Sequence, residues 1–245
     1  MVEKRRNKNM LSVIFLLCTF GVVFFCQSFT HGQNSHVNKS LKQAAESAFA
    51  KLKAEDNPDW EIIWHDDTKV AKRLFNGQSK VFPGKPQDAA HEFLSLYQGL
   101  FGLSANLESV KFQDSMKTPL GERVTFQQHD NDIPVIGAEI TVHVSDKNSV
   151  FLVENRYIPD IHIETEPLVQ KDEALETAMK AIFVDASKIE NASAELVIFI
   201  SGPEQNLAWR VIVSTKSLID KTWLIYVDAK KQGFVLYKKA LQASA

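Results

Sequence analysis

The stretch from Gly121 to Val144, GERVTFQQHDNDIPVIGAEITVHV, is the feature that most restricts what this chain of 245 residues can fold into. Ile140, Val142 and Val144 alternate with polar neighbours, as in a strand with one buried face. The run Asp130–Asp132 interrupts the pattern with residues that tolerate the backbone angles of tight turns. We therefore predict an antiparallel hairpin in which residues 123–129 pair with residues 134–144.

Two regions of the chain share one pattern, a helix followed by antiparallel strands. In the first, helical spacing covers residues 37–53 and 87–101, and alternating patterns predict further strands over 59–65, 110–115 and 149–157. The second begins at Lys171 with a helix over 172–184, and its predicted strands are 195–201, 207–214, 222–228 and 234–238. Helices laid on antiparallel sheets make an α+β fold. Residues 158–170, which contain Pro159 and Pro167, are the predicted boundary, and their early part could form an edge strand.

The first 32 residues have the layout of a targeting segment. Lys4 to Lys8 form a basic stretch, and residues 11–26 are almost wholly apolar. The apolar run is shorter than the ~20 residues of a comfortable membrane-spanning helix, but no small-residue cleavage pattern follows it. We predict that residues 1–32 are a signal peptide or, alternatively, an uncleaved anchor; if the segment is uncleaved, residues 11–26 are the only membrane contact. The protein is then exported, either secreted or held in the cell envelope or periplasm.

The composition of the exported body excludes several classes of function. Of the 28 basic and 30 acidic residues, 24 and 29 lie beyond the first thirty positions, and this mildly acidic balance argues against nucleic-acid binding. Both cysteines, Cys18 and Cys26, lie in the targeting segment. The body therefore has no disulfide, no thiolate nucleophile and no cysteine metal site.

Segments spread along the body carry a family resemblance. Residues 60–67, the helix AAHEFLSLYQGLFGLS and the strands RVTFQQ, IPVIGAEITVHV and VENRY together resemble the FTP domain, the fungalysin/thermolysin propeptide module. DEALETA, LAWRVIV and YVDAKKQGFVL resemble a PepSY domain. Both modules stand in this order in the precursors of thermolysin-family metalloproteases.

The resemblance implies a fold and a role. It implies two cystatin-like modules, each with a helix packed on a curved antiparallel sheet: an FTP-like domain over 33–160 and a PepSY-like domain over 161–245. Such propeptides assist the folding of their protease and inhibit it until they are removed. The implied partner is therefore the catalytic domain of a metalloprotease.

The sequence departs from the family in lacking the zinc motif H-E-x-x-H, which places two histidines one helical turn apart with a glutamate as base. The nearest match is His91-Glu92-Phe93-Leu94-Ser95, in which Ser95 replaces the second histidine. No nucleophile–base arrangement, phosphate-binding loop or dinucleotide fingerprint is present either. We therefore expect no catalytic residue, no metal and no cofactor, and interpret the body as non-catalytic.

The motif residues are interpreted as structural. Of the pair Gln127 and Gln128, one is expected to bond the backbone and the other to face water, because neighbours in a strand point to opposite sides. Pro134, Val135 and Gly137 are expected to shape the strand entry, and His143 to be a surface residue without partners. In the second region Trp209 is expected beneath the helix, while Asp228 opens a turn that ends at Gly233 and bonds its amides.

Several functions remain open at this point. The first is a free-standing propeptide that inhibits a thermolysin-like protease or helps it fold, using preformed sheets and exposed strand edges. The second is a membrane-anchored binding module of the cell envelope, and the third is a remnant of a precursor whose catalytic part is lost or encoded separately. An independent hydrolase has no supporting residues.

Overall fold

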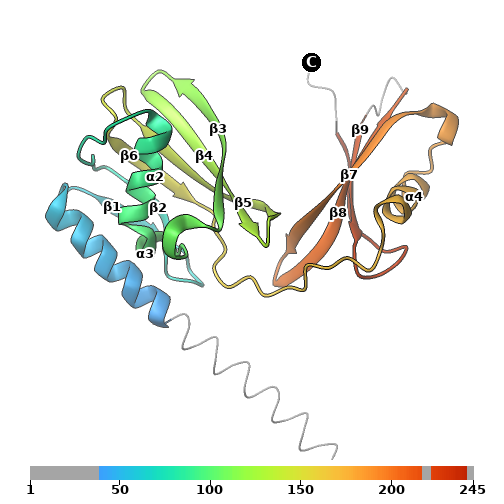
Figure 1. The fold of residues 1–245 in the computed structure, drawn as a ribbon, viewed down its shortest axis with the longest axis horizontal. Helices are drawn as coiled ribbons and strands as arrows, with labels where there is room; N and C mark the ends of the chain where they lie inside the picture. The colour runs from blue at the N-terminus through green and yellow to red at the C-terminus, as the bar shows by residue number, and fades with distance from the viewer. Residues whose placement is uncertain (1–38, 217–221, 242–245) are drawn as a thin grey trace, which may run out of the picture.

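Two lobes, each built of helix and sheet, make up the protein (Figure 1). The computed structural model describes residues 39–216 and 222–241, so the predicted targeting segment 1–32 lies outside the described residues. Among the described residues, no helix combines the length and the apolar character needed to cross a bilayer. The α+β class predicted from the sequence is confirmed, with much more sheet than helix.

The first lobe contains residues 39–55, which are helical, and then three further short helices and six strands. These are β1 (Glu61–Trp64), β2 (Ala71–Phe75), α2 (Pro86–Leu96), α3 (Gln98–Phe101), the 3₁₀ turn η1 (Ala105–Leu107), β3 (Val110–Thr118), β4 (Gly121–Asp130), β5 (Ile133–Val144) and β6 (Val150–Asn155). The second lobe contains α4 (Lys171–Ala181), the 3₁₀ turn η2 (Ala186–Lys188), β7 (Ile189–Ser201), β8 (Glu204–Thr215), β9 (Thr222–Asp228) and β10 (Val235–Leu241).

One ten-stranded sheet runs through both lobes. Its order is β1-β2-β6-β5-β7-β8-β9-β10, with β4 also paired to β5 and β3 added beyond β4. Every pairing is antiparallel except that of β5 with β7, which joins the lobes. The predicted hairpin is confirmed as β4 and β5, and Asn131 and Asp132 at its tip both have positive φ. Such a two-residue turn matches the twist of the strands.

Helix α2 forms because its sequence provides both a start signal and an apolar face. Pro86 occupies the first turn, and Asp88 accepts a hydrogen bond from the backbone of Lys85 at 2.9 Å. Phe93 and Leu94 are fully buried beneath it. The core of the first lobe gathers large aromatic and apolar side chains from the helices and the sheet, including Trp60, Phe82, Phe93, Tyr97, Phe101 and Phe126.

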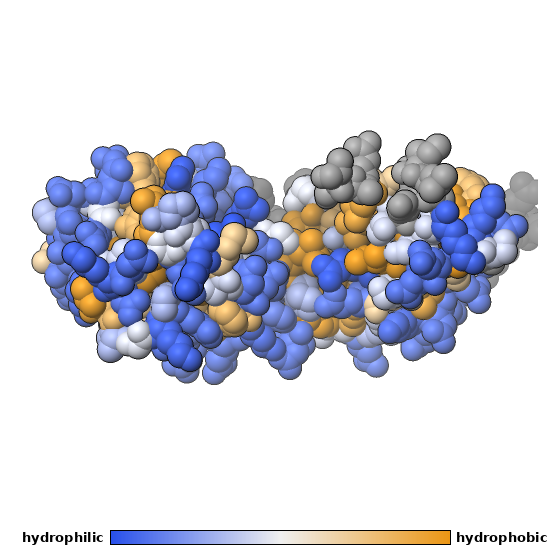
Figure 2. Space-filling model, turned by 90° about the horizontal axis from the view of Figure 1, so that it is seen from above, coloured by the Kyte–Doolittle hydropathy of each residue, from blue (hydrophilic) through white to orange (hydrophobic). Residues whose placement is uncertain are grey.

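The second lobe is smaller, and within residues 39–216 and 222–241 a helix covers only one face of its sheet. Ala174 and Ala178 of α4 pack on Val211, Ile225 and Val227. The opposite face carries a separate cluster in which the rings of Phe199 and Tyr226 stack with centroids 4.2 Å apart. Figure 2 shows hydrophobic residues gathered over this lobe beside its junction with the first.

The prediction misjudged the presence of a strand at two places. Strand β2 was not predicted, because its sequence AKRLF carries two adjacent charged residues and its partners β1 and β6 are not set by local pattern. The suggestion of an edge strand at the start of residues 158–170 was wrong, since this segment has neither strand nor helix. Figure 1 shows it running as an extended connection between the lobes.

Candidate functional site

The motif residues of the first lobe surround an irregularity in the β4–β5 hairpin. Gln127 pairs with Glu139, and His129 pairs with Pro134. Between these two pairs, β4 has one residue, whereas β5 has the four residues 135–138. The extra residues must leave the ladder, so β5 bulges away from β4 at this point.

The bulge is where the second lobe attaches. Val135 pairs with Ile198 of β7, and Gly137 adopts a positive φ of 78° while exposed to solvent. The side-chain amide of Gln127 bridges the bulge. Its Nε2 donates to the carbonyl oxygen of Val135 at 2.6 Å and to that of Ala138 at 2.9 Å. These carbonyl groups therefore have a donor although β4 no longer pairs with them.

Gln128 fixes the start of the connection between the lobes. Its Nε2 donates to the carbonyl oxygen of Ile158 at 2.8 Å, and its Oε1 accepts from the amide of Ile158 at 2.9 Å. The side chain is buried. The expectation that one of Gln127 and Gln128 faces water was therefore wrong, because the bulge and the connection give both amides backbone partners.

The far end of the same connection is held by the second lobe. The indole Nε1 of Trp209 donates to the carbonyl oxygen of Val169 at 2.8 Å. The amides of Leu168 and Val169 both donate to the carbonyl of Ala229, whose own amide donates to Leu207. Trp209 is only partly buried, and it packs beneath α4 and also against an apolar cluster that contains Val135 and Leu207.

Asp228 organises the turn that follows β9. Its Oδ1 accepts hydrogen bonds from the amides of Lys230 and Lys231, at 2.7 and 3.0 Å. The amide of Asp228 donates to the carbonyl of Phe234, and Gly233 provides the positive φ of 72° that the chain needs to turn back. The carboxylate thus stabilises the turn that positions Ala229 against the connection.

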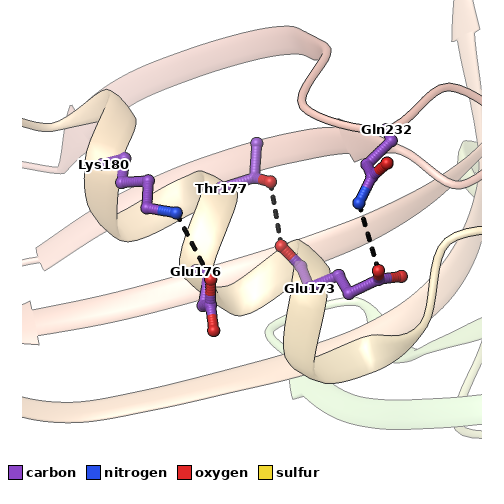
Figure 3. A network of polar contacts seen from close by, with 5 residues as sticks. All are labelled: Glu173, Glu176, Thr177, Lys180 and Gln232. Atoms are coloured by element: carbon purple, nitrogen blue, oxygen red, sulfur yellow. Dashed lines mark hydrogen bonds and ion pairs between the residues drawn. The ribbon is translucent and has the colours of Figure 1, made fainter.

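A polar network ties this turn to α4, as Figure 3 shows. Gln232 donates to Glu173 at 3.2 Å, and the hydroxyl of Thr177 donates to the carbonyl oxygen of Glu173 at 2.8 Å. Lys180 and Glu176 form an ion pair one turn further along the helix. These groups are exposed, so each contributes little stability. Their effect is to hold the turn beside the helix.

These contacts together form a joint between the lobes. Its small apolar core consists of Val135, Ala138, Ile198, Leu207 and Ala229. Most of the motif residues of both regions therefore meet in one place, where they position backbone groups, whereas His143 and Gly233 lie away from it. Ile158 and Ala229 complete the joint through main-chain hydrogen bonds, which leave no signal in the sequence.

His143 lies away from the joint and was wrongly expected to be a surface residue without partners. Its side chain is 19% exposed, its ring packs against Phe151, and its Nε2 lies 3.8 Å from Glu154. Burial has the largest effect and lowers the pKa of His143, Glu154 opposes this, and Arg123 adds to it. The sequence could not place Glu154 here, because the contact depends on the register between β5 and β6.

The near match to a zinc motif does not form a metal centre. His91 and Glu92 are both exposed on α2. Within residues 39–216 and 222–241, no group of three or more His, Cys, Asp or Glu side chains is placed to hold a metal ion.

Exposed strand edges are a second feature relevant to binding. Among the strands that the structure describes, β3 pairs only with β4, and β10 pairs only with β9. Large apolar side chains on these edges are well exposed, including Phe112 and Met116 on β3 and Tyr237 on β10. Such edges present backbone groups to which an extended segment of another chain can add.

Comparison with known proteins gives these features a context. Residues 108–157 match the Fungalysin/Thermolysin Propeptide Motif. The chain carries a thermolysin-family propeptide motif. The matched stretch runs from just before β3 to just after β6, so it includes the bulge, both glutamines of the joint and His143. It does not include the earlier segments 60–67 and 89–104 that contributed to the predicted resemblance.

Curated proteases are similar over a larger part of the chain. Bacillolysin from Brevibacillus brevis is 22% identical over 193 residues, covering 74% of this chain and 35% of that protein. Thermolysin from Bacillus caldolyticus is 26% identical over 190 residues, covering 73% of this chain and 33% of that protein. Neutral protease B from Bacillus subtilis (strain 168) is 22% identical over 214 residues, covering 84% of this chain and 39% of that protein. The chain spans about a third of the length of these relatives. Among solved structures, the C-terminal domain of Bacillus megaterium YpeB aligns with a TM-score of 0.39 and 15% identity, covering 83% of this chain and 96% of that one.

Proposed function

We propose that this protein is a non-catalytic, exported, propeptide-like protein that binds the catalytic domain of a thermolysin-like metalloprotease and inhibits it, assists its folding, or both. The observation that carries the proposal is the propeptide motif over residues 108–157. The similarity to bacillolysin and thermolysin over about three quarters of the chain supports it.

The proposal includes the finer assignments made from the sequence. Residues 33–160 form an FTP-like domain and residues 161–245 a PepSY-like domain, each a cystatin-like module. Residues 1–32 direct export. The two separate apolar cores, one under α2 and one under α4, support this division.

The geometry of the joint supports a binding role. A surface that is already ordered before binding loses less conformational entropy when a partner docks. The glutamine, tryptophan and aspartate contacts fix the connection at both ends, so both lobes present their sheets in a set arrangement. The exposed edges of β3 and β10 then supply backbone groups for a partner.

Inhibition can be tested directly by adding the purified protein to thermolysin and measuring hydrolysis of a small peptide substrate. We expect the initial rate to fall in a saturable way with the protein concentration. Subtilisin, which is not a metalloprotease, is the control, and gel electrophoresis should show that the added protein stays intact. Equal loss of rate with both proteases, through digestion of the added protein, would contradict specific inhibition.

Folding assistance needs a second assay. The denatured catalytic domain of a thermolysin-like protease is diluted from denaturant with and without the protein, and recovered activity is measured after the protein is removed. We expect a higher yield in its presence. If neither assay nor direct binding by calorimetry shows an effect for several such proteases, the proposed function is wrong.

A further inference from the structure

Strand β3 is an open edge of the first-lobe sheet, and part of its backbone is free to pair. Among the described strands it pairs only with β4. The amide of His129 donates to the carbonyl oxygen of Ser109 at 2.8 Å. Bonded and non-bonded residues alternate along an antiparallel ladder, so Lys111 also bonds to β4, whereas Val110 and Phe112 direct their amide and carbonyl groups outward.

A groove of about 620 Å³ lies beside these two residues, between β3 and α2. Helix α2 packs on β4, β5 and β6, so β3 extends the sheet past the helix (Figure 1). The floor of the groove is apolar and consists of Val110, Phe112 and Phe126. The rings of Phe112 and Phe126 meet edge to face with centroids 6.3 Å apart, yet the Phe112 side chain is 44% exposed. A large aromatic side chain is therefore left open to solvent within the groove.

The wall that α2 contributes is polar and acidic. Its side chains are those of Gln87, Asp88, His91, Glu92 and Ser95. The Asp88 carboxylate accepts a hydrogen bond from the backbone amide at the start of α2. The exposed Glu92 carboxylate, in contrast, has no hydrogen bond or ion pair within residues 39–216 and 222–241. The groove thus offers an unpaired negative charge beside an aromatic floor.

These two features select one kind of side chain. Lysine and arginine have an apolar stem that packs on aromatic rings and a cationic head that reaches a carboxylate. In a strand added to β3, the residues opposite Val110 and Phe112 would point their side chains to the same face of the sheet as these two residues. That face contains the groove. Backbone pairing and side-chain docking can therefore occur together.

We propose that the edge of β3 binds an extended segment of a partner protein by strand addition, with a lysine or arginine side chain of that segment lying in the groove against Phe112 and beside Glu92. This mode combines main-chain hydrogen bonds, which give affinity, with a pocket for alternate side chains, which gives specificity. The inference rests on the proposed function for the existence of a partner. It adds which exposed edge receives the partner and what chemistry the bound segment carries.

The groove beside the other exposed edge lacks the same charge. Between α4 and β10, Glu173 accepts a hydrogen bond from Gln232, and Glu176 forms an ion pair with Lys180. Both acids on this wall therefore already have partners. A basic segment is expected to choose β3 over β10.

The experiment is an NMR titration of the full-length protein with the blocked peptide Ac-Val-Thr-Lys-Thr-Val-NH₂, in which the lysine and both valines share one face of an extended chain. We expect saturable shifts of the Val110 and Phe112 amide signals and slower hydrogen exchange at Phe112. The same peptide with norleucine in place of lysine keeps the stem without the charge and should bind about threefold to fivefold more weakly. Equal binding of both peptides, no saturable binding of the lysine peptide, or shifts confined to β10 would overturn the proposal.

Methylation of peptide nitrogens tests the backbone pairing. With lysine opposite Phe112, a methyl group on the lysine backbone nitrogen removes the donor to the Phe112 carbonyl and should weaken binding at least about tenfold. A methyl group on the next threonine nitrogen, which points away from β3, should leave binding nearly unchanged. Equal binding by the two methylated peptides would overturn strand addition. Self-association of the protein that the lysine peptide reverses, measured by sedimentation, would overturn the assignment to another protein in favour of a second copy of this chain.

Variants assign the site. Glu92→Gln should weaken binding of the lysine peptide to the level of the norleucine peptide and leave the norleucine peptide unaffected. Glu204→Gln is the matched control, since Glu204 is an exposed acid on β8 without an ion pair to any described residue. Equal effects of these two substitutions would overturn the role of Glu92. The titration uses no protease, so inhibition of thermolysin without peptide binding would contradict this inference alone, whereas peptide binding without an effect on any protease would contradict only the proposed function.

Discussion

Replacing Gln128 by alanine should loosen the joint measurably. The substitution removes the donor to the carbonyl oxygen of Ile158 at 2.8 Å and the acceptor of its amide at 2.9 Å. A hydrogen bond contributes about 1 kcal/mol net, and each buried group left without a partner costs about 1–3 kcal/mol. Ile158 is half-buried, so water can replace part of the loss. We expect the free energy of unfolding to fall by about 2–3 kcal/mol.

Equilibrium unfolding in urea, followed by tryptophan fluorescence, measures this change. Trp60 and Trp64 report on the first lobe, and Trp209 and Trp223 report on the second. With a slope of roughly 2–3 kcal/mol/M, the midpoint should fall by about 1 M.

Two further variants sharpen the experiment. Gln128→Glu keeps an acceptor for the Ile158 amide but buries a carboxylate against the Ile158 carbonyl oxygen, so at neutral pH it should lose at least as much stability as Gln128→Ala. Gln87→Ala, on the exposed surface of α2, should stay within about 0.5 kcal/mol of the wild type. A midpoint for Gln128→Ala equal to that of Gln87→Ala would refute the role assigned to Gln128 in the joint.

Four other substitutions test three separate features. Gly77→Ala places a Cβ atom 2.1 Å from the Trp60 indole, and this clash should lower the free energy of unfolding in urea by about 1–3 kcal/mol. Gly202→Ala has open space around it and should lower the free energy of unfolding by only about 1–2 kcal/mol, because alanine disfavours the positive φ at this position. Trp209→Phe removes the hydrogen bond to Val169 and should lower the free energy of unfolding by about 1 kcal/mol; an unchanged urea midpoint would contradict this. Burial lowers the pKa of His143 in the folded protein; Glu154 opposes this effect, and Arg123 and Arg73 add to it. The folded pKa therefore lies below the unfolded pKa, and between these two values the unfolded state binds more protons than the folded state. Stability should therefore fall as pH drops from about 6.5 through the folded pKa, and His143→Gln should remove that part of the pH dependence of the thermal midpoint.

Local signals predicted most helices and hairpins of this fold. The β4–β5 hairpin follows from alternation and from Asn131 and Asp132 in the turn, because neighbours in sequence are also neighbours in the ladder. Helices α2 and α4 follow from apolar spacing with acidic residues in their first turns. Strand β7 begins at Ile189, earlier than predicted, because its first residues NASAE have low strand propensity and are ordered by pairing with β8.

Contacts between distant residues could not be predicted in the same way. The partner of Gln128 is a main-chain group 30 residues away, so no side chain marks it. The partner of His143 is set by the register of β6, and a shift of one residue would move Glu154 to the other face. The bulge at residues 135–138 needs a second lobe to accept Val135, and a hairpin pattern alone gives no sign of this.

The placement of the motif residues bears on how a protein of this kind can recognise a partner. Gln127, Gln128 and Trp209 use side-chain nitrogen atoms to donate to backbone carbonyl groups inside the joint, and Val135 pairs with β7 through its backbone. Residues of this motif therefore specify the arrangement of the two lobes. Under the proposed function, partner choice then depends on the exposed faces and edges that the joint holds in place. Changes in the joint should therefore weaken the binding of all partners alike, because they disturb the arrangement of both lobes.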